Sequence, residues 1–89
     1  MIKIVNTQYL GNKVIRLRFS DHSWGDYDVK PLIAKKTELV LPLQEDDYFS
    51  QFFLELGALC WKNGLEFSAG SLHRKLQERG GLHVGTEAA

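Results

Sequence analysis

Cysteine is nearly absent from this sequence, since Cys60 is the only one among 89 residues. A single thiol excludes an intrachain disulfide and argues against a cysteine-based metal site. Long apolar runs are missing as well, because Lys3, Asn6 and Gln8 interrupt the first apolar segment. No run approaches the roughly 20 residues of a membrane span. We therefore expect a cytoplasmic protein with no signal peptide and no membrane partner.

An excess of charge of one sign is also missing. Eleven basic side chains balance eleven acidic ones, so the formal net charge is +0. This balance supplies no general attraction to nucleic acid or to an anionic membrane. A single domain of this length buries only about 60–65% of the surface that its unfolded chain exposes. Association with another subunit would enlarge such a thin core.

The first third of the chain has the alternating pattern of antiparallel strands. Three runs, 2–9, 14–19 and 24–29, are separated by Gly11-Asn12 and by a turn at 21–23. In the second run the apolar positions are Ile15, Leu17 and Phe19. Period-two alternation predicts strands with one wet face, and short polar loops between them predict hairpins. We expect a three-stranded antiparallel meander.

Short helices are expected next. Residues 30–36 suit a helical turn opened by Pro31, whereas Pro42 makes residues 39–43 a connector or an edge strand. From Tyr48 to Leu56 the aromatic and apolar residues recur on one face of a 3.6-residue period, which predicts a helix closed by Gly57. The alternative makes 52–56 a strand because of its aromatic content.

The last part predicts a hairpin and a terminal helix. Asn63-Gly64 is a turn between strands at 58–61 and 65–67, and Ser68 or Ser71 can cap a helix that ends at Gly80-Gly81. The fold class is thus α+β, with an antiparallel meander, short helices, a C-terminal hairpin and a terminal helix. We expect one domain over 1–80 and a flexible tail over 81–89.

The segment around this turn resembles a family signature. The pattern Gly-x-(Leu/Ile)-x-Trp-Pro-Asn-Gly-x-Asp-(Leu/Phe)-x-Pro-x-x-Leu is typical of a small bacterial family, domain of unknown function twenty-four forty-two. The matching residues are Gly57, Leu59, Trp61, Asn63, Gly64, Phe67 and Leu72. Lys62 and Ala69 replace the two prolines, Glu66 replaces the aspartate, and Gly70 stands where an acidic residue is frequent. The likeness covers roughly residues 1 to 76.

The resemblance implies a compact α+β fold of about this size. Members of that family occur alone or beside a DNA-binding domain, and some are encoded next to small partner proteins as possible toxin–antitoxin components. No catalytic residues come with the family, so none is transferred to this chain.

Candidate catalytic and metal-binding residues are scattered. The three histidines, His22, His73 and His83, fall in a turn, a helix and the tail, with no spacing typical of zinc ligands. Cys60 lies in an apolar run, which favours an inert thiol. The acidic residues near 21–28 and 45–47 suit turns, a wet strand face and helix capping. We predict no enzyme activity, no metal and no cofactor.

A nucleic-acid surface is the weakest of the binding hypotheses. Arg16 and Arg18 share one strand face and could contact phosphates. The zero net charge, and the lack of an exposed aromatic pair beside these arginines, argue against it.

Crowded aromatic residues are the strongest functional signal. A small domain with an uncovered apolar strip or an open sheet edge offers an interface. We therefore predict a non-catalytic, self-associating interaction module that binds a copy of itself or another small protein. The candidate interaction residues are Phe49, Phe52, Phe53, Leu56, Trp61, Asn63 and Glu66.

Two other functions stay open. One is a small-ligand-binding or catalytic site near Trp24, Trp61 and Glu66, which would need a concave pocket with converging polar groups. The other, implied by the resemblance, is a regulator that works with a toxin–antitoxin-like or DNA-binding partner.

Overall fold

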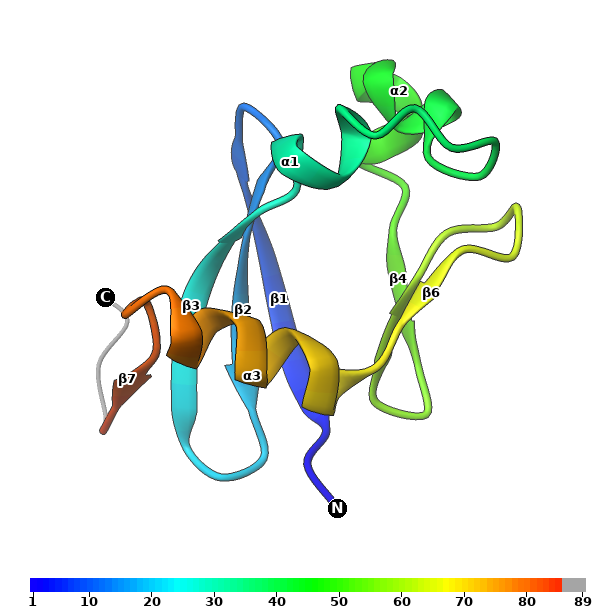
Figure 1. Ribbon diagram of the computed structural model, residues 1–89. Coiled ribbons are helices and arrows are strands. Elements are labelled where there is room, and N and C mark those ends of the chain that lie inside the picture. The colour runs from blue at the N-terminus through cyan, green and yellow to red at the C-terminus, as the bar shows by residue number, and fades with distance from the viewer. Residues whose placement is uncertain (86–89) are drawn as a thin grey trace.

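The meander expected from the sequence forms one wall of the molecule. This computed structural model describes residues 1–85 (Figure 1). Strands β1 (Ile4–Gly11), β2 (Val14–Phe19) and β3 (Ser23–Asp28) pair antiparallel, and β7 (His83–Val84) adds to the far side of β3. The result is a four-stranded sheet, here called sheet A, with strand order β1-β2-β3-β7.

A second, smaller sheet faces this wall. Sheet B contains β4 (Phe53–Glu55), β5 (Ala58–Cys60) and β6 (Glu66–Phe67) in that order, all antiparallel. Helix α3 (Ala69–Glu78) runs along one side of the molecule from sheet B to sheet A (Figure 1). Together these elements confirm the predicted α+β class with antiparallel sheets and short helices.

Three short helical segments cover one end of the molecule. They are α1 (Lys30–Ile33), the 3₁₀ helix η1 (Leu41–Gln44) and α2 (Asp46–Phe49), which lie together in Figure 1. Pro31 and Pro42 stand in the first turns of α1 and η1, where a missing backbone N–H leaves no helical bond unmade. Residues 39–43 are therefore a connector, one of the two expected forms.

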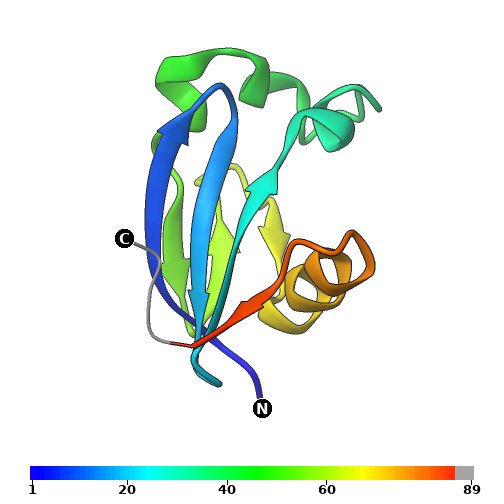
Figure 2. The same cartoon turned by 90° about the vertical axis from the view of Figure 1, so that its left-hand side faces the viewer.

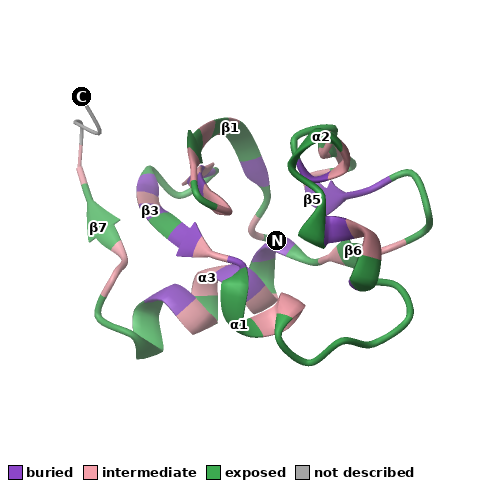
Figure 3. Cartoon of the chain, turned by 90° about the horizontal axis from the view of Figure 1, so that it is seen from above, coloured by how far each residue is buried: buried purple, intermediate pink, exposed green. Residues whose placement is uncertain are grey.

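The core lies between the two sheets and α3. Ile15, Leu17 and Phe19 are buried as their alternation predicted, whereas Arg16 and Arg18 remain partly exposed on the opposite face of β2. Seen from above, β5 is buried along its length and β7 is exposed (Figure 3). The face of sheet A turned away from the core, here called the outer face, is not covered by either sheet B or α3 (Figure 2).

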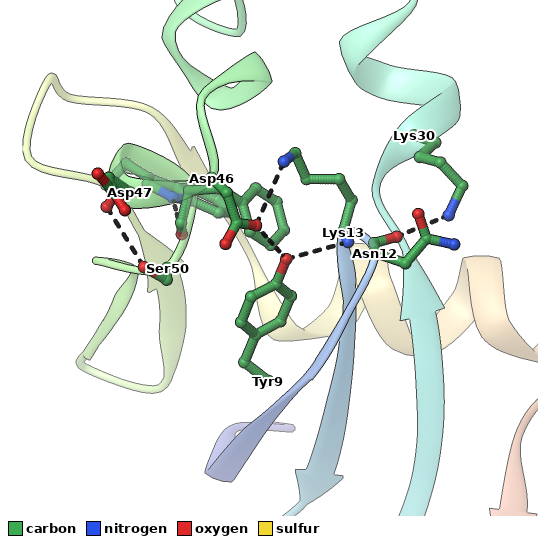
Figure 4. Close-up of polar contacts among 9 residues, drawn as sticks. Tyr9, Asn12, Lys13, Lys30, Asp46, Asp47 and Ser50 are labelled. Atoms are coloured by element: carbon green, nitrogen blue, oxygen red, sulfur yellow. Dashed lines mark hydrogen bonds and ion pairs between the residues drawn. The ribbon is translucent and has the colours of Figure 1, made fainter.

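The β1–β2 hairpin is fastened to α2 by a polar cluster. Asn12 and Lys13 form its two-residue turn with φ values of 56° and 63°. The Tyr9 hydroxyl donates to Asp46 Oδ1 at 2.5 Å and accepts from the Lys13 backbone N–H at 3.2 Å (Figure 4). Lys13 Nζ lies 3.4 Å from the same Asp46 oxygen, and Lys30 Nζ donates to the Asn12 carbonyl at 2.7 Å. These contacts join the turn to two helical segments far along the chain.

The helix predicted from Tyr48 to Leu56 is wrong, and the strand alternative holds. Helix α2 ends at Phe49, and β4 begins at Phe53, where it pairs with Cys60 of β5. The fully buried strand β5 needs hydrogen-bonding partners on both edges, and β4 supplies one of them. This pairing outweighs the helical spacing of the aromatic side chains, since local pattern yields to tertiary contacts.

Gly57 is accordingly part of a hairpin turn and not the helix cap that we expected. It follows Leu56 in the β4–β5 turn, and both residues have positive φ, 52° and 82°. Positive φ at both central positions is the geometry of a type I′ hairpin turn. A Cβ at Gly57 would stand 2.7 Å from Lys3 Cβ, because β1 starts beside the turn with Ile4 N–H donating to the Gly57 carbonyl at 2.9 Å.

The C-terminal elements follow the sequence more closely. The turn at 62–64 joins β5 to β6 through a 2.9 Å bond from the Trp61 N–H to the Leu65 carbonyl. Ser68 caps α3 by accepting from the Ser71 N–H at 3.2 Å, which is the expected N-terminal cap. Leu72 and Leu76 are buried on one face of that helix.

Within 81–89, where we expect a flexible tail, His83 and Val84 instead pair with Trp24 and Ser23. Residues 86–89 lie outside the described residues.

Replacing Gly57 with alanine tests the close approach of β1 to the β4–β5 turn. We expect Gly57→Ala to lower the free energy of unfolding by about 2–4 kcal/mol, because backbone strain at positive φ adds to the overlap with Lys3. Gly64→Ala is the control, since Gly64 also has positive φ (96°) but a Cβ there meets no atom within 4 Å. Urea unfolding of both variants measures the difference. Equal losses would show that the contact with Lys3 costs nothing.

Candidate functional site

Two of the predicted interaction residues belong to the core. Phe49 and Trp61 are buried, and the Trp61 indole N–H donates to the Phe49 carbonyl at 2.9 Å. Their ring centroids are 5.6 Å apart, and Phe52 and Phe67 each lie 6.1 Å from the Trp61 ring. The aromatic crowding noted in the sequence is largely this packed cluster, so Phe49 and Trp61 offer no surface to a partner.

The remaining predicted residues lie around sheet B. Asn63 is exposed but committed to its turn, since its side-chain nitrogen donates to the Leu39 carbonyl at 3.0 Å and its oxygen accepts from the Leu65 N–H at 3.2 Å. Phe53 is 42% exposed, and Glu66 is exposed beside it along a hollow of about 190 Å³. Phe52 is half-buried against the core.

Leu56 is the most conspicuous of them. Leu56 is 93% exposed at the tip of the β4–β5 turn, and its φ of 52° is unusual for a leucine. Exposed Met1 and partly buried Ile2 line a hollow of about 360 Å³ beside it, together with Ala58 and Ala69. We call Met1, Ile2 and Leu56 the apolar rim.

The cysteine is poorly suited to nucleophilic catalysis. Cys60 is buried in β5, and its Sγ lies 3.7 Å from the Ala58 carbonyl. Burial raises the pKa of the Cys60 thiol, and the charges of Glu66 and Glu55 raise it further. Thiolate is the reactive form, so each of these effects suppresses reactivity.

A Ser-Asp-His contact that the sequence did not suggest joins the β2–β3 turn to α3. Asp21 accepts from the Ser23 backbone N–H at 3.0 Å and from the Ser23 hydroxyl, and His73 Nε2 lies 3.0 Å from its other oxygen. The hydrogen bond from the Ser23 hydroxyl is the main cause that lowers the pKa of the Asp21 carboxyl. A catalytic triad needs the histidine beside the serine. Here the aspartate lies between them and Ser23 is buried, so the contact is structural.

The outer face of sheet A carries an aromatic pair that sequence reasoning missed. The Trp24 and His83 rings are stacked with centroids 4.4 Å apart, and Arg16 Cζ lies 4.9 Å from the Trp24 centroid. Arg16 also makes a two-pronged ion pair with Asp26, with N···O distances of 2.7 and 3.0 Å. His83 was unrecognisable as a partner because only β7 pairing brings it beside Trp24. The rings stack on each other, so the pair fastens β7 to the sheet.

The alternative ligand site is not assembled from the residues that we named. Trp61 and Glu66 line the same small hollow, but Trp24 lies on the outer face of sheet A, and Trp61 is in the core. Within residues 1–85 no three His, Cys, Asp or Glu side chains are grouped as metal ligands. None of the helices in that described part has the length and apolar character to cross a bilayer.

Comparison with protein-family models, with curated proteins and with solved structures gives no match to this chain. The resemblance to domain of unknown function twenty-four forty-two therefore stays a prediction, and the site must be judged by its geometry.

The carboxylates of Asp21 and Asp26 should make the protein sensitive to acid. The Ser23 hydroxyl lowers the pKa of Asp21, and the Arg16 guanidinium lowers the pKa of Asp26. A carboxyl whose pKa is lower in the folded state stabilises the protein at a pH above its unfolded pKa of about 4. This contribution is lost as the pH falls from there through the folded-state pKa. We expect Asp26→Asn to flatten the fall in unfolding free energy between about pH 5 and pH 2.

Urea unfolding at several pH values checks this, with Asp47→Asn as the control. The Asp47 carboxylate accepts no hydrogen bond within the described residues. If the unfolding free energy of Asp26→Asn fell with pH as steeply as that of Asp47→Asn, the role of the Arg16–Asp26 pair would be contradicted.

Proposed function

We propose that this protein is a non-catalytic interaction module that associates with a second copy of itself through the apolar rim. The observation that carries the proposal is Leu56, which is both exposed and held at positive φ. Asparagine, aspartate or glycine suits that turn position far better than leucine does.

The energetics favour a partner for Leu56. A non-glycine residue at positive φ costs on the order of 1 kcal/mol, and an exposed leucine recovers nothing by packing. Burying a leucine side chain gains about 1.5–3 kcal/mol. Burial against another molecule would therefore offset the backbone cost of a leucine at this turn.

The place of the rim suits two identical partners. The exposed Leu56 side chain lies beside the hollow lined by Ile2, Ala58 and Ala69, so a projection and a recess share one surface. In a two-fold symmetric dimer the same patch meets itself, and each Leu56 can enter the recess of the other copy. A thin core and zero net charge also support association without strong electrostatic repulsion. A foreign small protein, the partner class implied by the resemblance, would use the same rim.

Replacing Leu56 with asparagine separates association from folding. We expect the wild type to have a mass above that of one chain by size-exclusion chromatography with light scattering at high micromolar concentration, and Leu56→Asn to have the mass of one chain. The same substitution should raise the stability of the dilute monomer by about 0.5–1 kcal/mol in urea unfolding, because asparagine tolerates positive φ.

Leu41→Asn is the matched control, since Leu41 is 44% exposed in η1, away from the rim. It should leave the mass of the wild type unchanged. A wild type that stays monomeric at high concentration, or a Leu56→Asn protein that still associates, would contradict the proposal.

A further inference from the structure

A second hollow lies on the outer face of sheet A, away from the apolar rim. It has a volume of about 510 Å³ and lies where β1 and β2 meet the β2–β3 turn and the end of β7. Figure 2 shows this side of the sheet, with β7 crossing beside β3. The lining residues are Val5, Arg18, Phe19, Ser20, His22 and Gly85. This volume is within the range of about 300–1,000 Å³ that is usual for small-molecule sites.

Arg18 gives the hollow a positive charge that the described residues do not neutralise. Its neighbour on the same face, Arg16, is paired with Asp26. Arg18 lies opposite Asn6 on one side and Trp24 on the other, and within residues 1–85 its guanidinium makes no ion pair or hydrogen bond. An arginine stays charged at any physiological pH, so a partly buried one favours an anion beside it.

The turn at the end of β2 adds further polar groups. Ser20 Oγ accepts from the Lys3 N–H at 3.0 Å, which leaves the serine hydroxyl hydrogen able to donate to a ligand. His22 is exposed at the edge of the hollow and is held at a φ of 71°. The carboxylate of the same turn, Asp21, is occupied by Ser23 and His73. Arg18 and the Ser20 hydroxyl therefore both offer hydrogen-bond donors to the hollow.

An apolar wall completes the site. Val5 is 56% exposed and sits at a register shift between Ile4 and Asn6, which takes it out of the regular β1–β2 pairing. An exposed valine beside an arginine that has no ion-pair partner among residues 1–85 suits a ligand that is apolar at one end and charged at the other.

We propose that this hollow binds a small organic anion, a carboxylate or a phosphate ester with an apolar group. Arg18 and Ser20 hold the oxyanion, and Val5 contacts the apolar part. A polyanion such as nucleic acid fits less well, because Asp26 and Asp28 lie on the same strand face and the net charge is zero.

Nuclear magnetic resonance titration of the full chain tests the proposal with three probes: phenyl phosphate, benzoate and inorganic phosphate. We expect saturable shifts of the Val5, Ser20, His22 and Gly85 amide signals. Phenyl phosphate should bind at least about fivefold more tightly than inorganic phosphate, because it alone of the two buries apolar surface. Whether phenyl phosphate or benzoate binds more tightly identifies the oxyanion that the site prefers.

Two variants assign the contacts. Arg18→Gln should weaken phenyl phosphate binding about tenfold or more, since it removes a charge-assisted hydrogen bond. Arg74→Gln makes the same charge change at an exposed position of α3 and should leave binding unchanged. Val5→Thr should reduce the preference for phenyl phosphate over inorganic phosphate and preserve the binding of inorganic phosphate.

Three results would overturn the proposal. They are the absence of saturable shifts at these amides, shifts that Arg18→Gln does not affect, and equal affinity for phenyl phosphate and inorganic phosphate. Because the hollow and the apolar rim share no residues, Leu56→Asn should bind the probes as the wild type does.

Discussion

The hydrogen bond from the Trp61 indole to the Phe49 carbonyl, 2.9 Å long, is the buried polar contact around which the aromatic core packs. Trp61 follows β5 of sheet B, and Phe49 ends α2, so the bond fixes the short helices to the second sheet. Phe49 in turn packs on Tyr9 of sheet A with ring centroids 5.2 Å apart. One buried aromatic cluster thus links both sheets and α2, and its polar indole group is satisfied within the core.

This use of aromatic residues changes where an interaction surface can be. The rings that seemed available for a partner are largely consumed by a core that is small and needs them. The exposed apolar side chains are scattered over both sheets, and Leu56, at the β4–β5 turn of sheet B, is the one that also has a positive φ. Exposure combined with an unfavourable backbone conformation is a stronger sign of contact than exposure alone, because single exposed apolar residues are common on monomers.

On the outer face of sheet A, two arginines of the same strand have different surroundings within residues 1–85. Arg16 stacks on Trp24 and pairs with Asp26, whereas Arg18, two residues later, faces a hollow. Two arginines on the same face of β2 therefore differ in what they can bind. The difference arises from the β2–β3 register, which sets Arg16 opposite Asp26 and Arg18 opposite Trp24.

Local sequence determined the elements whose signals are short-range. The alternation of Ile15, Leu17 and Phe19 fixed the buried face of β2, and the Ser68 cap fixed the start of α3. Such signals act within a few residues and need no distant partner. The sequence likewise located the turn after β5, because Asn63 and Gly64 carry the required backbone chemistry.

Tertiary structure alone decided the rest. Phe53 to Glu55 form a strand because β5 offers its edge, and His83 and Val84 form one because β3 does. Which rings are buried and which arginine is paired were equally undetermined by sequence, since both depend on residues brought together from distant parts of the chain. Contacts of that kind leave no periodic signal in a single sequence, because the local pattern of each segment is compatible with more than one tertiary partner.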